Sequence, residues 1–97
     1  MLFIARFHDK PGVAERRAEL LKEHFAWLDA NRNRVLLAGA VRSVDGEPLG
    51  GLWIIEGESK ADVESVYQND PFFANGLRSK VEIFQYVKAN ADRLVTI

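Results

Sequence analysis

The sequence predicts an α+β domain in which a four-stranded antiparallel sheet carries both helices on one face. Two observations predict it. The hydrophobic periods follow the order β-α-β-β-α-β, and no linker or shift of composition divides the 97 residues. A chain of this length supports one core, because ordinary domains have about 100–150 residues. This order is the ferredoxin-like arrangement, so we expect one domain over residues 1–97.

Composition and charge exclude several classes of partner. Hydrophobic residues make up 47% of the chain and charged residues 28%, which is typical of a soluble globular fold. Thirteen basic and fourteen acidic residues give a net charge of -1, which provides no positive field for nucleic acid or anionic membranes. The longest apolar run, Val35–Val41, has seven residues, whereas a membrane-spanning helix needs about 20. We expect neither nucleic acid nor a membrane as partner.

The chain contains no cysteine, which excludes disulfides, thiolate zinc sites and cysteine nucleophiles and fits a reducing compartment. Its two histidines are separated by a strand and most of a helix and form no recognisable metal motif. Neither a Gly-rich phosphate loop nor a G-x-S-x-G motif occurs. No basic segment precedes the first apolar run, so no secretory signal is expected. We therefore expect a cytoplasmic protein without a cofactor.

A strand and a long helix are predicted at the start of the chain. Aromatic and branched residues in Met1–His8 predict the strand, which the turn formers of Asp9–Gly12 end. Apolar steps of three and four then predict a helix from Val13 to about Asn31. Its apolar stripe is expected to comprise Ala14, Ala18, Leu21, Phe25 and Leu28.

The next two strands lack the polar positions of a half-exposed sheet. Val35–Val41 contains no polar residue, and Leu52–Glu56 is apolar up to its last residue. The turn formers between Ser43 and Gly51 predict the loop that joins them. Strands of this kind are typical of a sheet covered on both faces. Because no residues remain for a second layer, we expect a homodimer in which a second copy covers the open face.

A second helix and a fourth strand complete the prediction. Ser59 lies three residues before Asp62, the spacing of a capping box with the shorter aspartate in place of glutamate. This motif predicts a helix that starts there and runs through about Gln68. Asn69–Pro71 ends this helix, because a residue before proline is pushed out of helical geometry. An apolar connector is expected over Phe72–Leu77. Alternating residues then predict the fourth strand over Lys80–Val87. The last segment, Lys88–Ile97, is either a tail or an added edge segment.

His24 is a candidate acid or base. It lies about 60° from the axis of the predicted stripe, at roughly 100° per residue, and so at the buried edge of the helix. Histidine exchanges a proton near neutrality, and a carboxylate on its other nitrogen fixes the tautomer. Asp70 ends the second helix on the same side of the sheet and is the candidate partner. Alternatively, His24 is a hydrogen-bonded core histidine and Asp70 only turns the chain, which is the commoner case for such a pattern.

Other residues allow two interpretations each. Arg6 and His8 share one face of the first strand, and either line a polar pocket or mark the open end of the strand, which is commoner. Trp53 either walls a site or packs the dimer interface, and we favour the interface. Asp45 and Glu47 lie in a loop that is ordinarily solvated but could fold over a pocket mouth.

Five features together resemble one family: a strand ending in Asp9-Lys10, His24 in the first helix, the strand Leu36–Gly39, the helix that Ser59 begins, and the segment Asn69–Leu77. Over about Met1–Val87 the sequence is similar to the YCII family of small α+β proteins. The most specific feature is the Asp-Pro-Phe segment followed by Gly-Leu and a last strand. The resemblance implies a dimeric α/β barrel of ferredoxin-like protomers. It also implies a histidine–aspartate pair in a pocket between helix and sheet.

The resemblance assigns roles to particular residues. His24 and Asp70 match the proposed catalytic pair, and Arg6, Arg17 and Phe72 are the candidate substrate-binding residues. Members often carry an arginine one turn before the histidine, where this chain has Leu21. Arg17, two turns before the histidine, is expected to reach the pocket instead. Most members have no assigned reaction, and one branch acts on chlorinated hydroxyquinones.

The leading hypothesis is a small homodimeric enzyme. His24 acts as general base or acid on a small cyclic or aromatic substrate, in an isomerisation or elimination, while Asp70 orients its imidazole. One alternative is a ligand-binding or regulatory module that breaks no bond. Another is an accessory dimerisation domain without a pocket. Ligand binding separates the last from the others, and turnover separates the first two.

Overall fold

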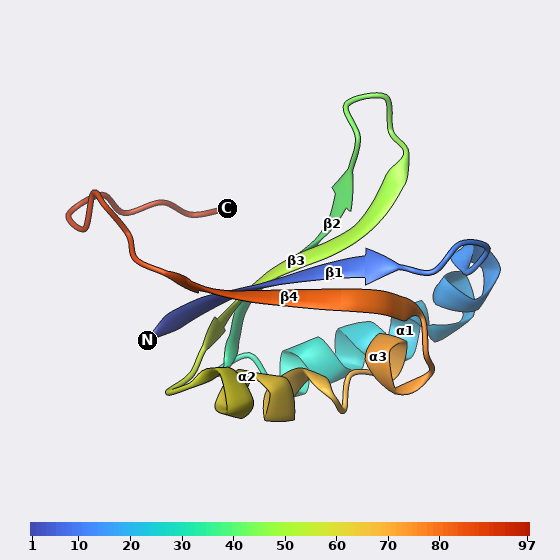
Figure 1. Ribbon diagram of the computed structural model, residues 1–97, viewed down its shortest axis with the longest axis horizontal. Coiled ribbons are helices and arrows are strands. Elements are labelled where there is room, and N and C mark those ends of the chain that lie inside the picture. Colours follow the sequence, from blue (N-terminus) through green and yellow to red (C-terminus); the bar gives the residue numbers. More distant parts are fainter.

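Four strands form one sheet, and the helices cover one of its faces (Figure 1). The computed structural model describes residues 1–97. Its elements are β1 (Leu2–Asp9), α1 (Ala14–Ala30), β2 (Val35–Arg42), β3 (Pro48–Glu56), α2 (Lys60–Tyr67), α3 (Pro71–Ala74) and β4 (Arg78–Tyr86). The strand order is β2-β3-β1-β4 with every neighbouring pair antiparallel. The predicted α+β class is confirmed, and the element order is the ferredoxin-like one.

The core lies between the sheet and the helices. The period of two along β1 turns Phe3, Ala5 and Phe7 toward the helices, and all three are buried. The rings of Phe7 and Trp53 pack with their centroids 4.6 Å apart. Burial of each large apolar side chain contributes roughly 1.5–3 kcal/mol. The other members of this core come from β2, β3 and α2: Val35, Trp53, Ile55, Val63 and Tyr67.

The buried face of α1 differs from the predicted stripe. Leu20 and His24 are its buried residues, so the histidine lies in the middle of the packed face rather than at its edge. Phe25, which was predicted to point inward, is 58% exposed. The helix is therefore rotated, relative to the prediction, to bring polar side chains under the sheet as well as apolar ones.

The start of α2 is capped as predicted. The backbone N–H of Asp62 donates to the Ser59 hydroxyl at 3.1 Å. The Asp62 carboxylate in turn accepts the backbone N–H of Glu58 at 2.9 Å and the Arg34 guanidinium at 2.8 Å. These contacts, the Glu58 N–H foremost, hold the pKa of Asp62 below its ordinary value of 3.8.

Three segments differ from their predicted form. The strand β3 begins at Pro48 rather than Leu52, so β2 and β3 form a longer hairpin around a shorter turn. Pro71–Ala74, which overlaps the start of the predicted connector Phe72–Leu77, forms the short helix α3. Proline suits a first helical position, because its missing N–H is not needed there. Residues 88–97 form neither helix nor strand.

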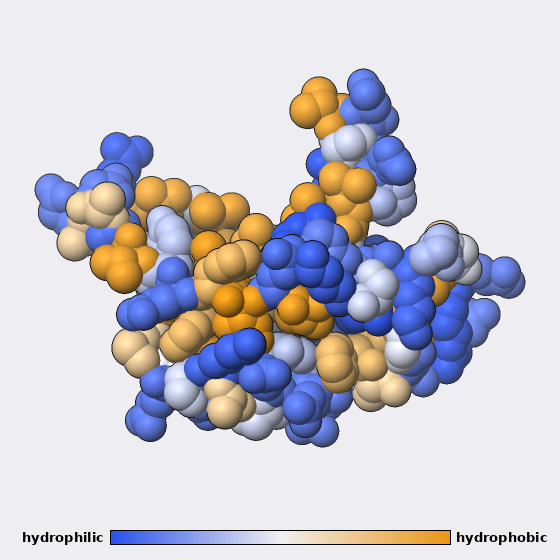
Figure 2. All heavy atoms as spheres, in the orientation of Figure 1, coloured by the Kyte–Doolittle hydropathy of each residue, from blue (hydrophilic) through white to orange (hydrophobic).

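The face of the sheet opposite the helices, here called the open face, is mainly apolar. The hairpin of β2 and β3 and the C-terminal segment both extend to this side of the sheet (Figure 1). Figure 2 shows apolar atoms gathered between them. The strand registers align seven partly or largely exposed apolar side chains on this face: Leu2, Ile4, Leu37, Leu52, Ile54, Phe84 and Tyr86.

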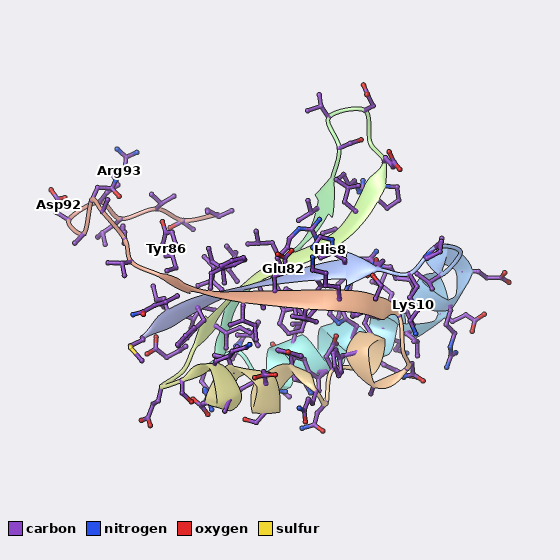
Figure 3. The ribbon with its side chains drawn as sticks, viewed as in Figure 1. His8, Lys10, Glu82, Tyr86, Asp92 and Arg93 are labelled. Carbon is purple, nitrogen blue, oxygen red and sulfur yellow. The ribbon has the colours of Figure 1, made fainter.

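A hydrogen-bonded polar pair lies on the open face beside the apolar side chains. His8 and Glu82 point toward one another across β1 and β4 (Figure 3), with His8 Nε2 2.7 Å from Glu82 Oε1. This hydrogen bond is the main reason that the pKa of Glu82 lies below its ordinary value. None of the helices combines the length and apolar character that crossing a bilayer requires.

Candidate active site

Asp70 brings a carboxylate into the space between the helices and the sheet. The residue precedes Pro71, and its backbone is extended with φ -62° and ψ 132°, as this position favours. Its side chain makes no capping bond to α3. Instead, the fully buried carboxylate places Oδ1 2.5 Å from Nδ1 of His24. Asp70 Oδ2 is enclosed without a hydrogen-bond partner.

His24 is held on three sides by its neighbours. Its ring stacks on Phe72, with centroids 3.9 Å apart and 12° between the planes, and Trp53 lies 6.0 Å away between centroids. Nδ1 faces Asp70. Nε2 makes no hydrogen bond within the chain and is not among the fully enclosed polar atoms, so it meets the cavity that His24 lines.

A cavity of about 360 Å³ opens beside His24. Small-molecule sites ordinarily have about 300–1,000 Å³, so a single-ring ligand fits. The walls come from α1, β2, β3 and β4 and include His24, Phe25, Ala38, Gly51, Trp53 and Arg78. A larger cavity of about 660 Å³ lies toward the start of α1 and shares Arg17 and Arg42 with the first, but it does not reach His24. Because His24, with Asp70 behind it, is the group that can transfer a proton, we take the smaller cavity as the candidate site.

Arg78 supplies a buried cation that the sequence did not predict. Its side chain is 3% exposed, and Nη1 donates to Asp9 Oδ1 at 2.6 Å. The guanidinium also lies over the ring of Phe7, 4.6 Å from the centroid. Asp9 ends β1 and Arg78 begins β4, and the two oppose each other across an irregularity in the register. The signal available in the sequence was a charged pair at the facing ends of two neighbouring antiparallel strands.

The predicted substrate-binding residues lie in three different places. Arg17 lines the cavity, with its guanidinium 5.0 Å from the centroid of the Phe72 ring and Nε 3.9 Å from Asp9 Oδ2. Phe72 is fully buried beneath His24 and supports the imidazole instead of lining the cavity. Arg6 is not brought to this cavity, because it points to the open face and donates to the carbonyls of Phe7, Gly51 and Leu49.

Trp53 is placed differently from its prediction. We favoured the dimer interface, but the side chain is 1% exposed and packs under the helices against Phe7 and Trp27. The expectation is wrong because β3 is apolar on both faces, so its sequence does not indicate which set of side chains turns inward. Trp53 instead forms part of the cavity wall.

The side chains that commonly bind metal ions do not cluster in this structure. No group of three or more histidine, aspartate or glutamate side chains is arranged to hold an ion. His24 and Asp70 face one another, and the cavity wall beside them carries guanidinium and indole groups. This arrangement can exchange a proton and bind a ligand oxygen.

These features define a class of small ferredoxin-like domains with a buried histidine–aspartate pair beside a cavity between helix and sheet. The model of the YCII-related domain matches residues 1–87, and the chain belongs to this family. A comparison with curated proteins gave no match.

Two solved structures illustrate the similarity. The 5-chloro-2-hydroxyhydroquinone dehydrochlorinase TftG from Burkholderia phenoliruptrix AC1100, in complex with 2,5-dihydroxybenzoquinone, is 26% identical with a TM-score of 0.81, and the match covers 96% of this chain and 100% of that one. PA3566 from Pseudomonas aeruginosa is 23% identical with a TM-score of 0.51, covering 90% of this chain and 91% of that one. The second supports the fold alone.

Proposed function

We propose that this protein is an enzyme that transfers a proton on a small cyclic or aromatic substrate, with His24 as general base or acid. One observation carries the proposal: Nδ1 of His24 is held by Asp70 while Nε2 remains free at a cavity large enough for one ring. A histidine that served packing alone would have no need for a vacant nitrogen at a cavity.

Asp70 fixes the tautomer that this role requires. An ionised carboxylate only accepts hydrogen bonds, so the proton resides on Nδ1 and the lone pair on Nε2. Asp70 Oδ2 has no partner of its own. General acid–base catalysis of this kind contributes about 10²–10⁴-fold in rate.

The reaction class is isomerisation or elimination initiated by proton transfer. A ring proton or hydroxyl proton passes to Nε2 of His24, and the electron pair shifts to a ring oxygen or expels a leaving group from the ring. Arg17 lines the same cavity and attracts an oxygen that carries negative charge. Phe72 holds the imidazole plane by stacking. The similarity to a dehydrochlorinase that binds a dihydroxybenzoquinone supports a hydroxylated ring as substrate.

The functional form is proposed to be a homodimer whose two open faces pack together. Seven apolar side chains on the open face would otherwise meet water, which is a liability for a monomer. Pairing two copies around a twofold axis covers both faces with the same contacts. The cavity beside His24 lies on the helix side of the sheet and stays available in such a dimer.

The test uses 5-chloro-2-hydroxyhydroquinone as the first substrate and measures chloride release, which accompanies loss of one proton from the ring system. His24→Gln is expected to lower the rate at least about 100-fold. His8→Gln is the matched control, since His8 is the only other histidine and lies on the open face. Equal rates for the two variants would contradict the proposal. Binding without turnover, across halogenated and non-halogenated hydroxyquinones, would favour a ligand-binding module.

A further inference from the structure

A glycine leaves room for a ligand atom in the cavity wall. Gly51 lies on the helix-facing side of β3 and lines the cavity. A Cβ atom at Gly51 would lie 3.6 Å from Arg78 Nη2, 3.7 Å from Trp53 Nε1 and 3.2 Å from the Gly39 carbonyl oxygen. The absent side chain therefore marks a point that two nitrogen donors approach from different residues.

Neither Arg78 Nη2 nor Trp53 Nε1 donates a hydrogen bond to another group of the chain. Arg78 forms its hydrogen bond to Asp9 through Nη1, and Trp53 Nε1 forms none. Arg78 Nη2 and Trp53 Nε1 retain contact with the cavity, whereas Arg78 Nε is fully enclosed. An indole N–H or guanidinium N–H that is almost wholly buried ordinarily has an acceptor. A ligand oxygen is the acceptor that the cavity can supply.

The local charge selects the kind of oxygen. Asp9 is the only carboxylate that contacts Arg78, and it also lies 3.9 Å from Arg17 Nε. One negative charge therefore faces two guanidinium groups, while the carboxylate of Asp70 faces His24. Arg78 is 3% exposed and uses only Nη1 on Asp9, so Nη2 has no carboxylate of its own. An oxygen that carries negative charge forms a stronger hydrogen bond to such a guanidinium N–H than a neutral oxygen does.

We propose that Arg78 and Trp53 form an oxyanion-binding subsite over Gly51, which takes the ionised hydroxyl or enolate oxygen of a ring held beside His24. The inference rests on the proposed function and specifies its substrate as an anionic ring compound. When His24 Nε2 takes a proton, a C–H or O–H bond breaks, an N–H bond forms, and the electron pair of the broken bond comes to rest on this oxygen. Fixed donors at that position stabilise the charge as it develops.

The subsite lies close enough to the base to act on the same ring. The centroids of the Trp53 and His24 rings are 6.0 Å apart. Arg78 and His24 both contact Phe72, with the guanidinium carbon 5.3 Å and the imidazole centroid 3.9 Å from the centroid of that ring. Proton acceptor and oxyanion donors thus occupy neighbouring walls of one cavity.

The test compares two probes that differ in charge, 2,5-dihydroxybenzoquinone and its dimethyl ether, by isothermal titration calorimetry at pH 7. The hydroxyls of the first probe are vinylogous acids and ionise below neutrality, whereas the ether stays neutral. The wild-type chain is expected to prefer the ionised probe about tenfold or more. Trp53→Phe removes the indole N–H together with the five-membered ring that carries it and is expected to lower that preference about tenfold. Gly51→Ala places a methyl group beside both donors, where it narrows the access of a ligand oxygen to them, and is expected to lower the preference at least as much.

Trp27→Phe is the matched control, because Trp27 packs on the same core without lining the cavity. It is expected to keep the wild-type preference. If Trp53→Phe and Gly51→Ala, both folded by circular dichroism, also keep the preference, the subsite is overturned while His24-dependent chloride release still supports the proposed function. If the wild-type chain binds neither probe and His24→Gln leaves chloride release unchanged, both proposals fail.

Discussion

The imidazole of His24 lies 3.9 Å from the ring of Phe72, centroid to centroid, with only 12° between the two planes. The two residues come from α1 and α3, and Asp70, the residue before α3, places its carboxylate at Nδ1 of the same imidazole. The short segment Asp70–Phe72 thus supplies both the ring on which the imidazole rests and the carboxylate that faces its Nδ1.

Replacing Asp70 by asparagine is expected to slow turnover about 10²–10⁴-fold. The amide can donate a hydrogen bond to Nδ1, which moves the imidazole proton to Nε2 and removes the lone pair from the cavity. The tautomer of His24 is read from its ¹⁵N chemical shifts, and the rate from chloride release. Asp45→Asn, in the exposed hairpin turn, is the control and is expected to match the wild-type chain. A folded Asp70→Asn chain with wild-type rate would remove Asp70 from the mechanism.

Replacing Phe72 by alanine is expected to cost about 3–5 kcal/mol of unfolding free energy. The ring is fully buried and packs with Leu20 and Leu77 as well as with His24. Urea denaturation followed by circular dichroism gives the change. Phe25→Ala serves as control, since that ring is 58% exposed, and its cost is expected to stay below about 1 kcal/mol. Similar costs for the two variants would show that α3 does not pack as described.

Stability is expected to depend on Asp62 at neutral pH and to lose that dependence in acid. Its pKa is below 3.8 in the folded chain, chiefly because the Glu58 N–H and then Arg34 favour the ionised form. Such a depressed pKa stabilises the fold above the unfolded-state pKa, and the effect is lost as pH falls through the folded-state value. Asp62→Asn should therefore lower the urea midpoint at pH 7 and have progressively less effect below pH 3.8. A difference between the two chains that does not change with pH would contradict this account.

Introducing charge on the open face is expected to separate the proposed dimer. Ile54→Glu places a carboxylate between Ile4 and Leu37 on the neighbouring strands. Light scattering coupled to size exclusion should give twice the 11.0 kDa chain mass for the wild-type chain and a single chain mass for the variant. Val44→Glu adds the same charge at the fully exposed hairpin turn and should leave the mass unchanged. A monomeric wild-type chain would contradict the dimer.

The fold could be predicted because periods of two and near four in the sequence follow from backbone geometry alone. The two expected helices and the four strands are present, and Ser59 begins α2 as predicted. Backbone geometry fixes the period of α1 but not which of its faces packs against the sheet. Phe25 favoured one stripe by hydrophobicity, whereas the partners available to His24 and Arg17 turned another stripe inward.

The site could be predicted only in part. The residue pattern offered His24 and Asp70 as a candidate pair, and the resemblance favoured a functional role for them. Their contact depends on the short helix α3, which the sequence pattern did not indicate. Arg78 was missed because its role comes from an irregularity in strand pairing, and such a shift leaves little trace in periodicity. Trp53 was misplaced because an apolar strand gives no indication of which face is inward.

The site joins distant parts of the chain. The contact between His24 and Asp70 spans 46 positions, and the ion pair between Asp9 and Arg78 spans 69. The second contact closes only when the edge strand β4 has paired beside β1, so a chain without β4 lacks Arg78 in the cavity wall. Contacts between residues so far apart in the sequence require a large loss of loop-closure entropy, and they form slowly during folding. Ligand affinity in a denaturant series should consequently vanish in one step with the global transition, which makes the cavity a built-in gauge of complete folding.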